Sequence, residues 1–384
     1  MQRLNHKSIV LILLVALTSE SCTNSYLGRW FIWNKSDVYD YEKFPSHNFK
    51  ASDAPFVFPR NPDNKYDTFS VSEKGTHKLP LLDLLKANHT TAFLVIRNDS
   101  ILYERYLNGY DEQSTNTSFS TAKSITSLLV GRAIADGFIA SERDAVSVYL
   151  PELLETDTAY ASVTISDVLD MRSGIQFKDH DLPWGDKPKA YYHPKLRERI
   201  RELPITTPPG TQFKYNSYNP IVAGMILEKA TGSSPAHYFE RTIWDELGMQ
   251  YAGSWSMDSE ESKMTKMESG LNLTAIDFAK LGRLVLHQGN WNGKQVVPEQ
   301  WINACMAINS EHHLKEFGDE IYYENFWWLY SKDKKTAYIV SAWGHLGQYL
   351  YIFPEKNLII VRMGKKTGKV ESWGNIFKEI AGYR

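Results

Sequence analysis

The sequence predicts an α/β fold in which strands from both ends of the chain form one antiparallel sheet, flanked by helices and interrupted by a mostly helical lobe. Three observations predict it: strand-type hairpin patterns over 91–106 and 348–363, helical patterns between them, and an amphipathic pattern at the C-terminus. Strands so far apart in the chain can share a sheet only if the segment between them folds as an insertion.

Length and composition agree with a large globular fold. The chain has 384 residues, of which 42% are hydrophobic and 23% charged, which excludes disorder as its main state. The 43 Lys and Arg residues nearly balance the 45 Asp and Glu residues. Because binding to phosphates requires a basic surface, a nucleic-acid partner is not expected.

Residues 1–22 have the pattern of an export signal. A basic head with Arg3 and Lys7 is followed by a ten-residue apolar run over 8–17. That run is too short to span a bilayer core of about 30 Å as a helix, but it suits a secretory signal. The step from Ser21 to Cys22 resembles the lipobox of bacterial lipoproteins, which implies a lipid on Cys22 and a membrane anchor. The protein would then be an exported lipoprotein of the bacterial cell envelope, facing the periplasm or the cell surface. Plain secretion is the alternative.

The next segment, 23–80, is predicted to be an irregular tether and lead-in, because five prolines interrupt any periodic pattern. A folded domain over 81–384 follows. Its first element is a hairpin with strands over 91–96 and 100–106, both rich in β-branched and aromatic residues.

The middle of the chain, about 124–300, is predicted to be the inserted helical lobe. Thr164 with Asp167 forms a capping box for a helix of about ten residues that Gly174 ends. Ser234 and Thr274 begin two further helices. A second hairpin and a C-terminal helix close the chain. That helix places four apolar side chains on one face, Trp373, Ile376, Phe377 and Ile380.

The first candidate for catalysis is Ser120, followed three residues later by Lys123 at the predicted start of a helix. At this spacing the two side chains share one face of the helix, which is the geometry that a hydroxyl nucleophile and an amine base require. The alternative is an N-cap serine beside a solvated lysine. The same spacing recurs over 331–334, in a charged run that we interpret as a surface loop.

The second candidate pairs Tyr215 with Ser217, between a Pro-Gly turn and a predicted helix. A loop in this position can project side chains into a cleft. A tyrosine there could relay a proton between the lysine, the serine and a leaving group. A core tyrosine with a paired hydroxyl explains the pattern equally well when it is taken alone.

The third candidate is the run from His345 through Gly347 to Gln348, at the start of a predicted strand. Glycine at a strand edge lets a substrate approach the backbone, and the amide that follows it can point at a carbonyl oxygen. His345 is expected to face the same cleft. The alternative is a strand-end histidine bonded to a neighbour.

Together the three motifs resemble those of the penicillin-recognising serine hydrolases, which include class C β-lactamases, D-alanyl-D-alanine carboxypeptidases, and related esterases and amidases. The family pattern is Ser-x-x-Lys, then Tyr-x-Asn or Tyr-x-Ser, then Lys-Thr-Gly or His-x-Gly, and all three occur here in that order from about residue 90 onward. Lys366-Thr367-Gly368 also spells the third motif. Only sixteen residues follow it, too few for the two strands and the helix that the fold then requires.

The resemblance implies a β-lactamase/transpeptidase-like fold and hydrolysis through an acyl-enzyme on Ser120. Lys123 or ionised Tyr215 would take the proton of the serine, and the backbone amides of Ser120 and Gln348 would hold the oxyanion. Gly347, His345 and Ser217 would complete the substrate site. The resemblance implies no cofactor, no metal, and a small-molecule or peptide substrate.

Departures from the β-lactamase pattern indicate the substrate class. Ser217 stands where β-lactamases have asparagine, and His345 with Leu346 replaces the Lys-Thr pair that binds a substrate carboxylate. A largely neutral histidine is a poorer partner for a carboxylate. In its motifs the chain most resembles the esterase and nylon-oligomer amidase branch of the family, and this resemblance implies cleavage of an ester or amide. The alternatives are a D-Ala-D-Ala carboxypeptidase, a weak β-lactamase, or a non-catalytic binding lipoprotein.

The segment 176–194 is rich in polar and aromatic residues, Trp184 among them. It is a candidate loop over the cleft, and an ordinary surface loop is the alternative.

Overall fold

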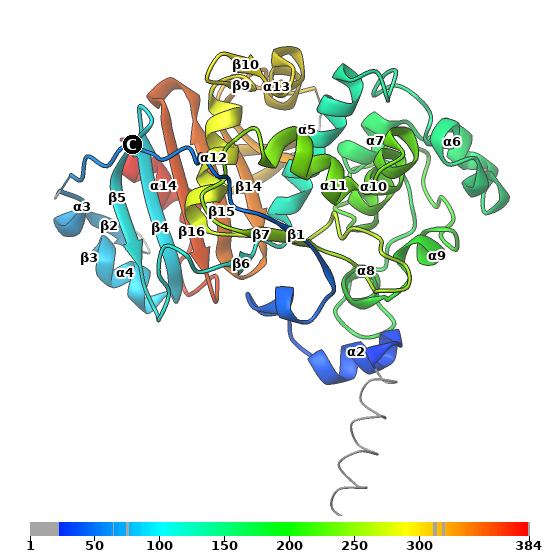
Figure 1. Ribbon diagram of the computed structural model, residues 1–384, viewed down its shortest axis with the longest axis horizontal. Helices are drawn as coiled ribbons and strands as arrows, with labels where there is room; N and C mark the ends of the chain where they lie inside the picture. Colours follow the sequence, from blue (N-terminus) through cyan, green and yellow to red (C-terminus); the bar gives the residue numbers. More distant parts are fainter. Residues whose placement is uncertain (1–22, 64, 74–76, 310–312, 317–318, 383–384) are drawn as a thin grey trace, which may run out of the picture.

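The computed structural model describes residues 23–63, 65–73, 77–309, 313–316 and 319–382. Its centre is an eight-stranded antiparallel sheet with the order β11-β12-β13-β14-β15-β16-β4-β5 (Figure 1). The strands are β4 Thr90–Arg97, β5 Ser100–Tyr106, β11 His313–Glu316, β12 Asp319–Glu324, β13 Trp327–Ser331, β14 Ala337–Gly344, β15 Gln348–Phe353 and β16 Leu358–Gly364.

The two predicted hairpins are the β4–β5 and β15–β16 pairs, and they adjoin each other in the sheet. β16 runs antiparallel to β4, with Leu358 opposite Arg97 and Gly364 opposite Thr90. The predicted sheet made from both ends of the chain is therefore confirmed.

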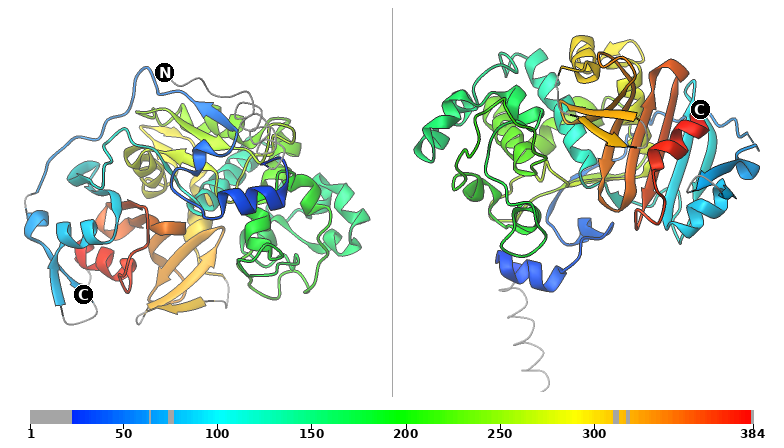
Figure 2. Two further views of the ribbon diagram at one scale, coloured as in Figure 1. Left: turned by 90° about the horizontal axis from the view of Figure 1, so that it is seen from below. Right: turned by 180° about the vertical axis from the view of Figure 1, so that it is seen from behind.

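Helices cover both faces of this sheet, which explains why β4 is buried at every position except its last. Leu94 faces a core that includes side chains of α5 and α12, whereas its neighbours Phe93 and Val95 face a core that includes side chains of α4 and α14. Figure 2 shows α14 lying across this second face. The helices of the domain are α4 Leu81–Ala87, α5 Thr121–Ala135, α6 Val146–Tyr149, α7 Ile165–Leu169, α8 Asp186–Tyr192, α9 Leu196–Ile200, α10 Tyr218–Thr231, α11 Pro235–Phe239, α12 Ala275–Leu286, α13 Glu299–Met306 and α14 Trp373–Ala381.

Helix α7 begins as predicted but is half the predicted length. Thr164 and Asp167 form the capping box, yet the helix ends at Leu169. Met171 then adopts the left-handed region with a φ of 58°, and its carbonyl accepts the amide of Lys214 at 2.8 Å. This hydrogen bond to the loop before Tyr215 ends the helix at Leu169, five residues before Gly174.

Residues 23–80 are more regular than their prolines suggest. They form α2 Tyr26–Trp33, β1 Ser46–Phe49, α3 Lys65–Thr68, β2 Ser70–Glu73 and β3 His77–Pro80. β1 joins a second sheet by pairing with β7 Gly253–Ser256, and its Phe49 packs against Trp244 with the rings tilted and their centroids 4.8 Å apart. The partners lie about two hundred residues away, so no local pattern reveals them. No helix of the described residues has the length and hydropathy needed to cross a membrane.

A buried arginine fixes the turn between β14 and β15. Arg362 on β16 donates to the carbonyls of Gly347 at 2.6 Å, Asn88 at 2.7 Å and Lys366 at 3.0 Å, and to the Thr90 hydroxyl at 3.0 Å. Gly347 has a φ of 84°, and a Cβ atom there would overlap the Arg362 guanidinium. Glycine is thus required both by the backbone and by the packing.

Substituting this glycine is expected to destabilise the fold. Gly347→Ala places a residue with a Cβ atom in the left-handed region, which costs about 1–2 kcal/mol of folding free energy. The added methyl group also overpacks the site against Arg362, which costs about 1–3 kcal/mol more. Gly109→Ala is the matched control, because Gly109 has the same φ of 84° but no atom near its Cβ position. Urea denaturation should show the larger loss for Gly347→Ala. Equal losses for the two variants would contradict the packing argument.

Candidate active site

Ser120 lies where the chain turns sharply into α5. The preceding Phe119 has a φ of 51°, a strained conformation for a large side chain, and Ser120 is the N-cap residue of the helix. Its side chain makes no capping hydrogen bond, so the alternative of a purely capping serine does not hold. The hydroxyl instead faces a cavity, where the helix N-terminus favours negative charge.

Lys123 is one turn further along α5 and only 1% exposed. Its Nζ donates to Ser120 Oγ at 2.7 Å and to the backbone carbonyl of Glu268 at 2.9 Å. The solvated-lysine alternative is therefore excluded, and the serine and lysine of the first motif are in direct contact.

Tyr215, in the loop before α10, lies beside Lys123 in the wall of the same cavity. Its ring stacks on Trp328 at 5.9 Å and meets Tyr323 edge-on at 5.7 Å. Lys123 Nζ lies 5.2 Å from the centroid of the Tyr215 ring. The Tyr215 hydroxyl has no hydrogen-bond partner in the described part of the chain, so the phenol is near the serine and lysine without being bonded to either.

The loop that carries Tyr215 and Ser217 is held by the buried side chain of Asn216. That side chain donates to the carbonyl of Ile175 at 3.0 Å and accepts the amide of Tyr218 at 2.9 Å. Ser217 is the N-cap residue of α10 and lines the cavity.

The third motif is only partly at the cavity. His345 and Leu346 line it, but Gly347 and Gln348 do not. Gln348 is fully buried, and its side chain donates to the carbonyl of Gly364 at 2.6 Å and accepts the amide of the same residue at 3.2 Å. This differs from the prediction for Gly347 and Gln348. The cause is a three-residue turn over 345–347, in which Leu346 has a φ of 62° and breaks the strand alternation.

His345 packs edge-on against Phe119, with ring centroids 5.4 Å apart. Burial lowers the pKa of the His345 imidazole, so the ring is neutral at pH 7. Gly344, just before it, lies so close to Ser118 that a Cβ atom would overlap the Ser118 carbonyl oxygen. The start of the turn is thus pressed against the segment that leads into Ser120.

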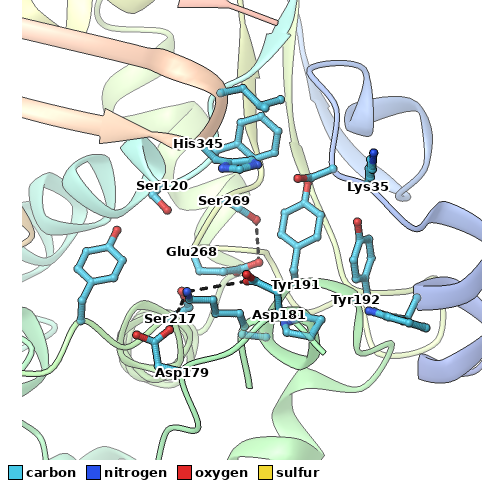
Figure 3. Close-up of a pocket in the computed structure, with 18 of the residues that line it drawn as sticks. Lys35, Ser120, Asp179, Asp181, Tyr191, Tyr192, Ser217, Glu268, Ser269 and His345 are labelled. Atoms are coloured by element: carbon cyan, nitrogen blue, oxygen red, sulfur yellow. Dashed lines mark hydrogen bonds and ion pairs between the residues drawn. The ribbon is translucent and has the colours of Figure 1, made fainter. Parts of the chain in front are cut away.

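These residues surround one cavity of about 790 Å³ (Figure 3). Sequence reasoning missed the part of its lining that comes from the N-terminal segment, which includes Trp30 and Lys35. The segment before and within α8 contributes Asp179, Asp181, Lys187, Tyr191 and Tyr192. Lys187 pairs with Asp179 at 2.8 Å and with Asp181 at 3.8 Å. The predicted loop over 176–194 does line the cavity.

Trp184 itself does not line the cavity. Its side chain is 62% exposed, in a turn closed by the Gly185 amide and the Leu182 carbonyl at 2.8 Å. The turn carries Trp184 outward, against His180 at a centroid distance of 6.1 Å.

Glu268 is the least expected member of the lining. It is 2% exposed, and one of its carboxylate oxygens accepts Lys266 Nζ at 2.7 Å and Ser269 Oγ at 2.8 Å. It lies in an irregular stretch before β8 Leu271–Leu273, where no periodic signal marks it. Only the fold shows that it adjoins Lys123.

Among the described residues, one group offers metal-type ligands, and it does not line this cavity. His47, His237 and Glu240 bring three ligand atoms within 4.8 Å of one another. A hydrogen bond of 2.7 Å between His47 Nε2 and Glu240 Oε2 explains why these two side chains lie close together without a metal ion between them.

Comparison with known proteins gives consistent matches. The family model named Beta-lactamase matches residues 84–381. The 6-aminohexanoate-dimer hydrolase of Paenarthrobacter ureafaciens is 26% identical over 307 residues, covering 74% of this chain and 75% of that protein. A solved structure from Bacillus anthracis, described as a 6-aminohexanoate-dimer hydrolase, superimposes with a TM-score of 0.79 at 26% identity, covering 90% of this chain and 92% of that chain.

Two more distant structures share the fold. A penicillin-binding protein from Bacillus halodurans has a TM-score of 0.60 at 17% identity, covering 77% of this chain and 96% of that chain. EstCE1, a hydrolase with promiscuous acyltransferase activity, has a TM-score of 0.63 at 12% identity, covering 78% of this chain and 95% of that chain.

Proposed function

Because this chain belongs to the beta-lactamase family and is a serine hydrolase, we propose that Ser120 is its nucleophile and that it cleaves an ester or amide through an acyl-enzyme. The observation that carries this proposal is the 2.7 Å contact between Lys123 Nζ and Ser120 Oγ in the wall of the cavity. A nucleophile with an adjacent base is the arrangement that covalent catalysis requires.

In the proposed reaction, Lys123 in its amine form takes the hydroxyl proton while Ser120 Oγ bonds to the substrate carbonyl carbon. The tetrahedral intermediate collapses when the bond to the leaving group breaks, and the leaving group receives a proton. Water then attacks the acyl-enzyme by the same route in reverse, which releases the acid and restores the serine. Tyr215 would pass the proton to the leaving group; the support is its ring, which lies 5.2 Å from Lys123 Nζ.

The developing oxyanion needs two backbone donors. The amide of Ser120 at the start of α5 is one of them. For the second we propose the amide of His345, in place of that of Gln348, because the Gly344–His345 segment lies against the approach to Ser120 whereas Gln348 lies outside the cavity. Each donor is expected to lower the barrier by about 3–4 kcal/mol.

The role of the phenol gives a prediction. Tyr215→Phe is expected to lower kcat/KM for p-nitrophenyl butyrate by about 10²-fold, at the lower end of what general acid–base catalysis contributes. Tyr192→Phe is the matched control, because Tyr192 lines the cavity but is not packed against Lys123. Steady-state kinetics on the two purified variants would decide. An unchanged Tyr215→Phe enzyme would remove the phenol from the mechanism.

Substrate class is proposed from the third motif and from the relatives. A neutral His345 cannot form an ion pair with a substrate carboxylate, so penicillins and D-Ala-D-Ala peptides lose the partner that the lysine of the β-lactamase third motif would give them. Two of the relatives carry the name 6-aminohexanoate-dimer hydrolase. We therefore expect cleavage of small esters and of linear amides such as the 6-aminohexanoate dimer, with little turnover of nitrocefin. A catalytically silent binding protein is disfavoured by the intact Ser120–Lys123 contact.

A hydrolysis panel tests this function. Purified protein is incubated with p-nitrophenyl butyrate, the 6-aminohexanoate dimer, nitrocefin and a D-Ala-D-Ala peptide, with Ser120→Ala as the control. Cleavage of the ester and the dimer by the wild type alone is expected. If wild type and Ser120→Ala behave alike on every substrate, the proposal fails.

We also propose export and lipid attachment at Cys22, which lies outside the described residues. The support is the sequence pattern of residues 1–22. Metabolic labelling with an alkyne fatty acid in a bacterial host is expected to mark the wild type and not Cys22→Ser, and labelling of neither would favour plain secretion.

A further inference from the structure

The N-terminal helix α2 carries apolar side chains on its outer face. Leu27 is 63% exposed, Phe31 79% and Ile32 48%. Leu27 and Phe31 are one helical turn apart, so they lie on the same face of the helix. Single exposed apolar residues are common, but exposed apolar side chains that gather at one place mark a surface that binds a partner. The outer face of α2 is therefore a candidate interaction surface.

The inner face of α2 holds the helix on the rest of the protein. Arg29 is only 4% exposed, and its guanidinium donates to the carbonyl of Asp258 and, at 3.4 Å, to that of Tyr192. Trp33 packs edge-on against Phe44, with ring centroids 5.0 Å apart. Because these contacts fix the orientation of the helix, the apolar side chains of its outer face stay exposed as a permanent feature of the fold.

A turn before α8 adds two exposed apolar side chains beside this helix. Leu182 is 50% exposed and Trp184 62%. The hydroxyl of Tyr26, in the first turn of α2, donates to the carbonyl of Pro183 at 2.6 Å, so the turn is attached to the helix. Figure 1 shows α2 and α8 together at the lower edge of the molecule. We define the apolar patch by its exposed side chains, Leu27, Phe31, Ile32, Leu182 and Trp184.

The position of α2 in the chain indicates what covers the apolar patch. Thr23 directly follows Cys22, the proposed site of lipid attachment, and the carbonyl of Thr23 accepts a hydrogen bond from Arg29 Nε at 2.6 Å. Neighbouring Cα atoms are about 3.8 Å apart. A lipid on Cys22 would therefore bring α2 to the surface of the bilayer that holds the lipid.

The local composition suits a bilayer surface. Residues 23–36 contain no Asp or Glu, but they include two tryptophans, one tyrosine and two basic residues. Aromatic and basic residues beside apolar ones are typical of segments that lie in a membrane interface. The one acid next to Leu182 in the turn is Asp181, and its carboxylate is paired with Lys187 at 3.8 Å. The charge of this acid is therefore partly neutralised at the border of the apolar patch.

We propose that the apolar patch is the surface with which the protein lies on a phospholipid bilayer, its side chains inserted at the level of the headgroups. The proposal rests on the proposed lipid attachment and goes beyond it, because it names the face of the fold that meets the membrane. Trp30 of α2 and Lys35 after it line the cavity. One wall of the active site would thus lie at the bilayer surface.

A partition measurement tests the apolar patch without the lipid. The full chain with Cys22→Ser is mixed with vesicles of phosphatidylcholine and phosphatidylglycerol, and the bound fraction is measured by flotation. Adding Leu27→Ser and Phe31→Ser is expected to lower the partition coefficient by at least about tenfold, because two apolar side chains no longer enter the bilayer. Val148→Ser is the matched control, since Val148 is 66% exposed on α6, away from the apolar patch. Hydrolysis of p-nitrophenyl butyrate should be equal in all three proteins, which shows that the fold is intact.

A fluorescent probe locates the contact. An environment-sensitive dye is attached to Trp184→Cys in the Cys22→Ser chain, in which the remaining cysteine, Cys305, is buried. Nitroxide-labelled lipids in the vesicles are expected to quench this dye and to leave a dye on Val148→Cys unquenched. Because Trp184 is far from residues 1–22 in the chain, quenching there reports on the apolar patch itself.

Two results would overturn the proposal. One is equal partition of the serine double variant and Val148→Ser, and the other is an unquenched dye at position 184 on vesicle-bound protein. A dimer that Leu27→Ser and Phe31→Ser convert to a monomer in light scattering, with vesicle partition unchanged, would assign the apolar patch to a second copy of the chain instead. Failure of the proposed lipid attachment is distinguishable, because Cys22 would then take up no fatty acid while the difference in partition remained.

Discussion

Ser120→Ala is expected to lower kcat/KM for p-nitrophenyl butyrate by at least about 10⁴-fold, the scale of loss when a serine hydrolase is deprived of its nucleophile. The Ser120 hydroxyl oxygen is the atom that bonds to the substrate, and among the described residues it is the one hydroxyl to which Lys123 Nζ donates, at 2.7 Å. The alanine enzyme keeps the α5 N-terminus, so its fold and its cavity should persist. Steady-state kinetics and the urea midpoint, measured together, separate chemistry from stability.

The chain contains its own control for this substitution. Ser331 heads the second Ser-x-x-Lys run, and its Oγ bonds to Asp333 and to the carbonyl of Thr336 in a turn of the β13–β14 connection. Ser331→Ala should leave hydrolysis of p-nitrophenyl butyrate within a factor of about two. Comparable losses in both serine variants would show that the assay reports on folding instead of on the nucleophile.

Lys123→Met is expected to be the second most damaging change, lowering kcat/KM by about 10³–10⁴-fold, the upper end of the range for a general base. Methionine fills similar space in this buried position but cannot accept the serine proton. The Ser120 hydroxyl would remain, so slow reaction with a fluorophosphonate should survive. Single-turnover kinetics with p-nitrophenyl butyrate would show slower acylation.

The comparison with Tyr215→Phe identifies the base. If the lysine takes the proton, Lys123→Met must cost more than Tyr215→Phe. The reverse order would assign proton abstraction to an ionised Tyr215 and would contradict the role argued for Lys123. Lys334→Met, in the second Ser-x-x-Lys run, is the control, since its side chain is 65% exposed.

Local patterns predicted the parts of the fold that depend on neighbours in the chain. The capping residues Thr164, Ser234 and Thr274 begin their helices as expected, and both hairpins form. The segment 23–80 could not be predicted, because β1 is stabilised by pairing with β7 and not by a periodicity of its own. The short α7 has the same cause, since Met171 leaves the helix to meet the loop before Tyr215.

Part of the candidate site could likewise be predicted from local sequence patterns, and part of it could not. Ser120 and Lys123 are three residues apart on one helix, so their contact follows from helical geometry. Gln348 was expected at the cavity because its backbone amide follows a glycine at the start of a strand, but the turn over 345–347, with Leu346 in the left-handed region, brings His345 and Leu346 to the cavity instead. Glu268, Lys35 and Asp181 reach the cavity from three separate segments, and no spacing in the sequence could bring them together.

Acylation of Ser120 can be observed by intact-mass spectrometry after treatment with a fluorophosphonate, followed by peptide mapping. One adduct per chain is expected on the wild type, located on Ser120, and none on Ser120→Ala. An adduct on any other residue, or an unlabelled wild type that still hydrolyses p-nitrophenyl butyrate, would contradict the acylation of Ser120.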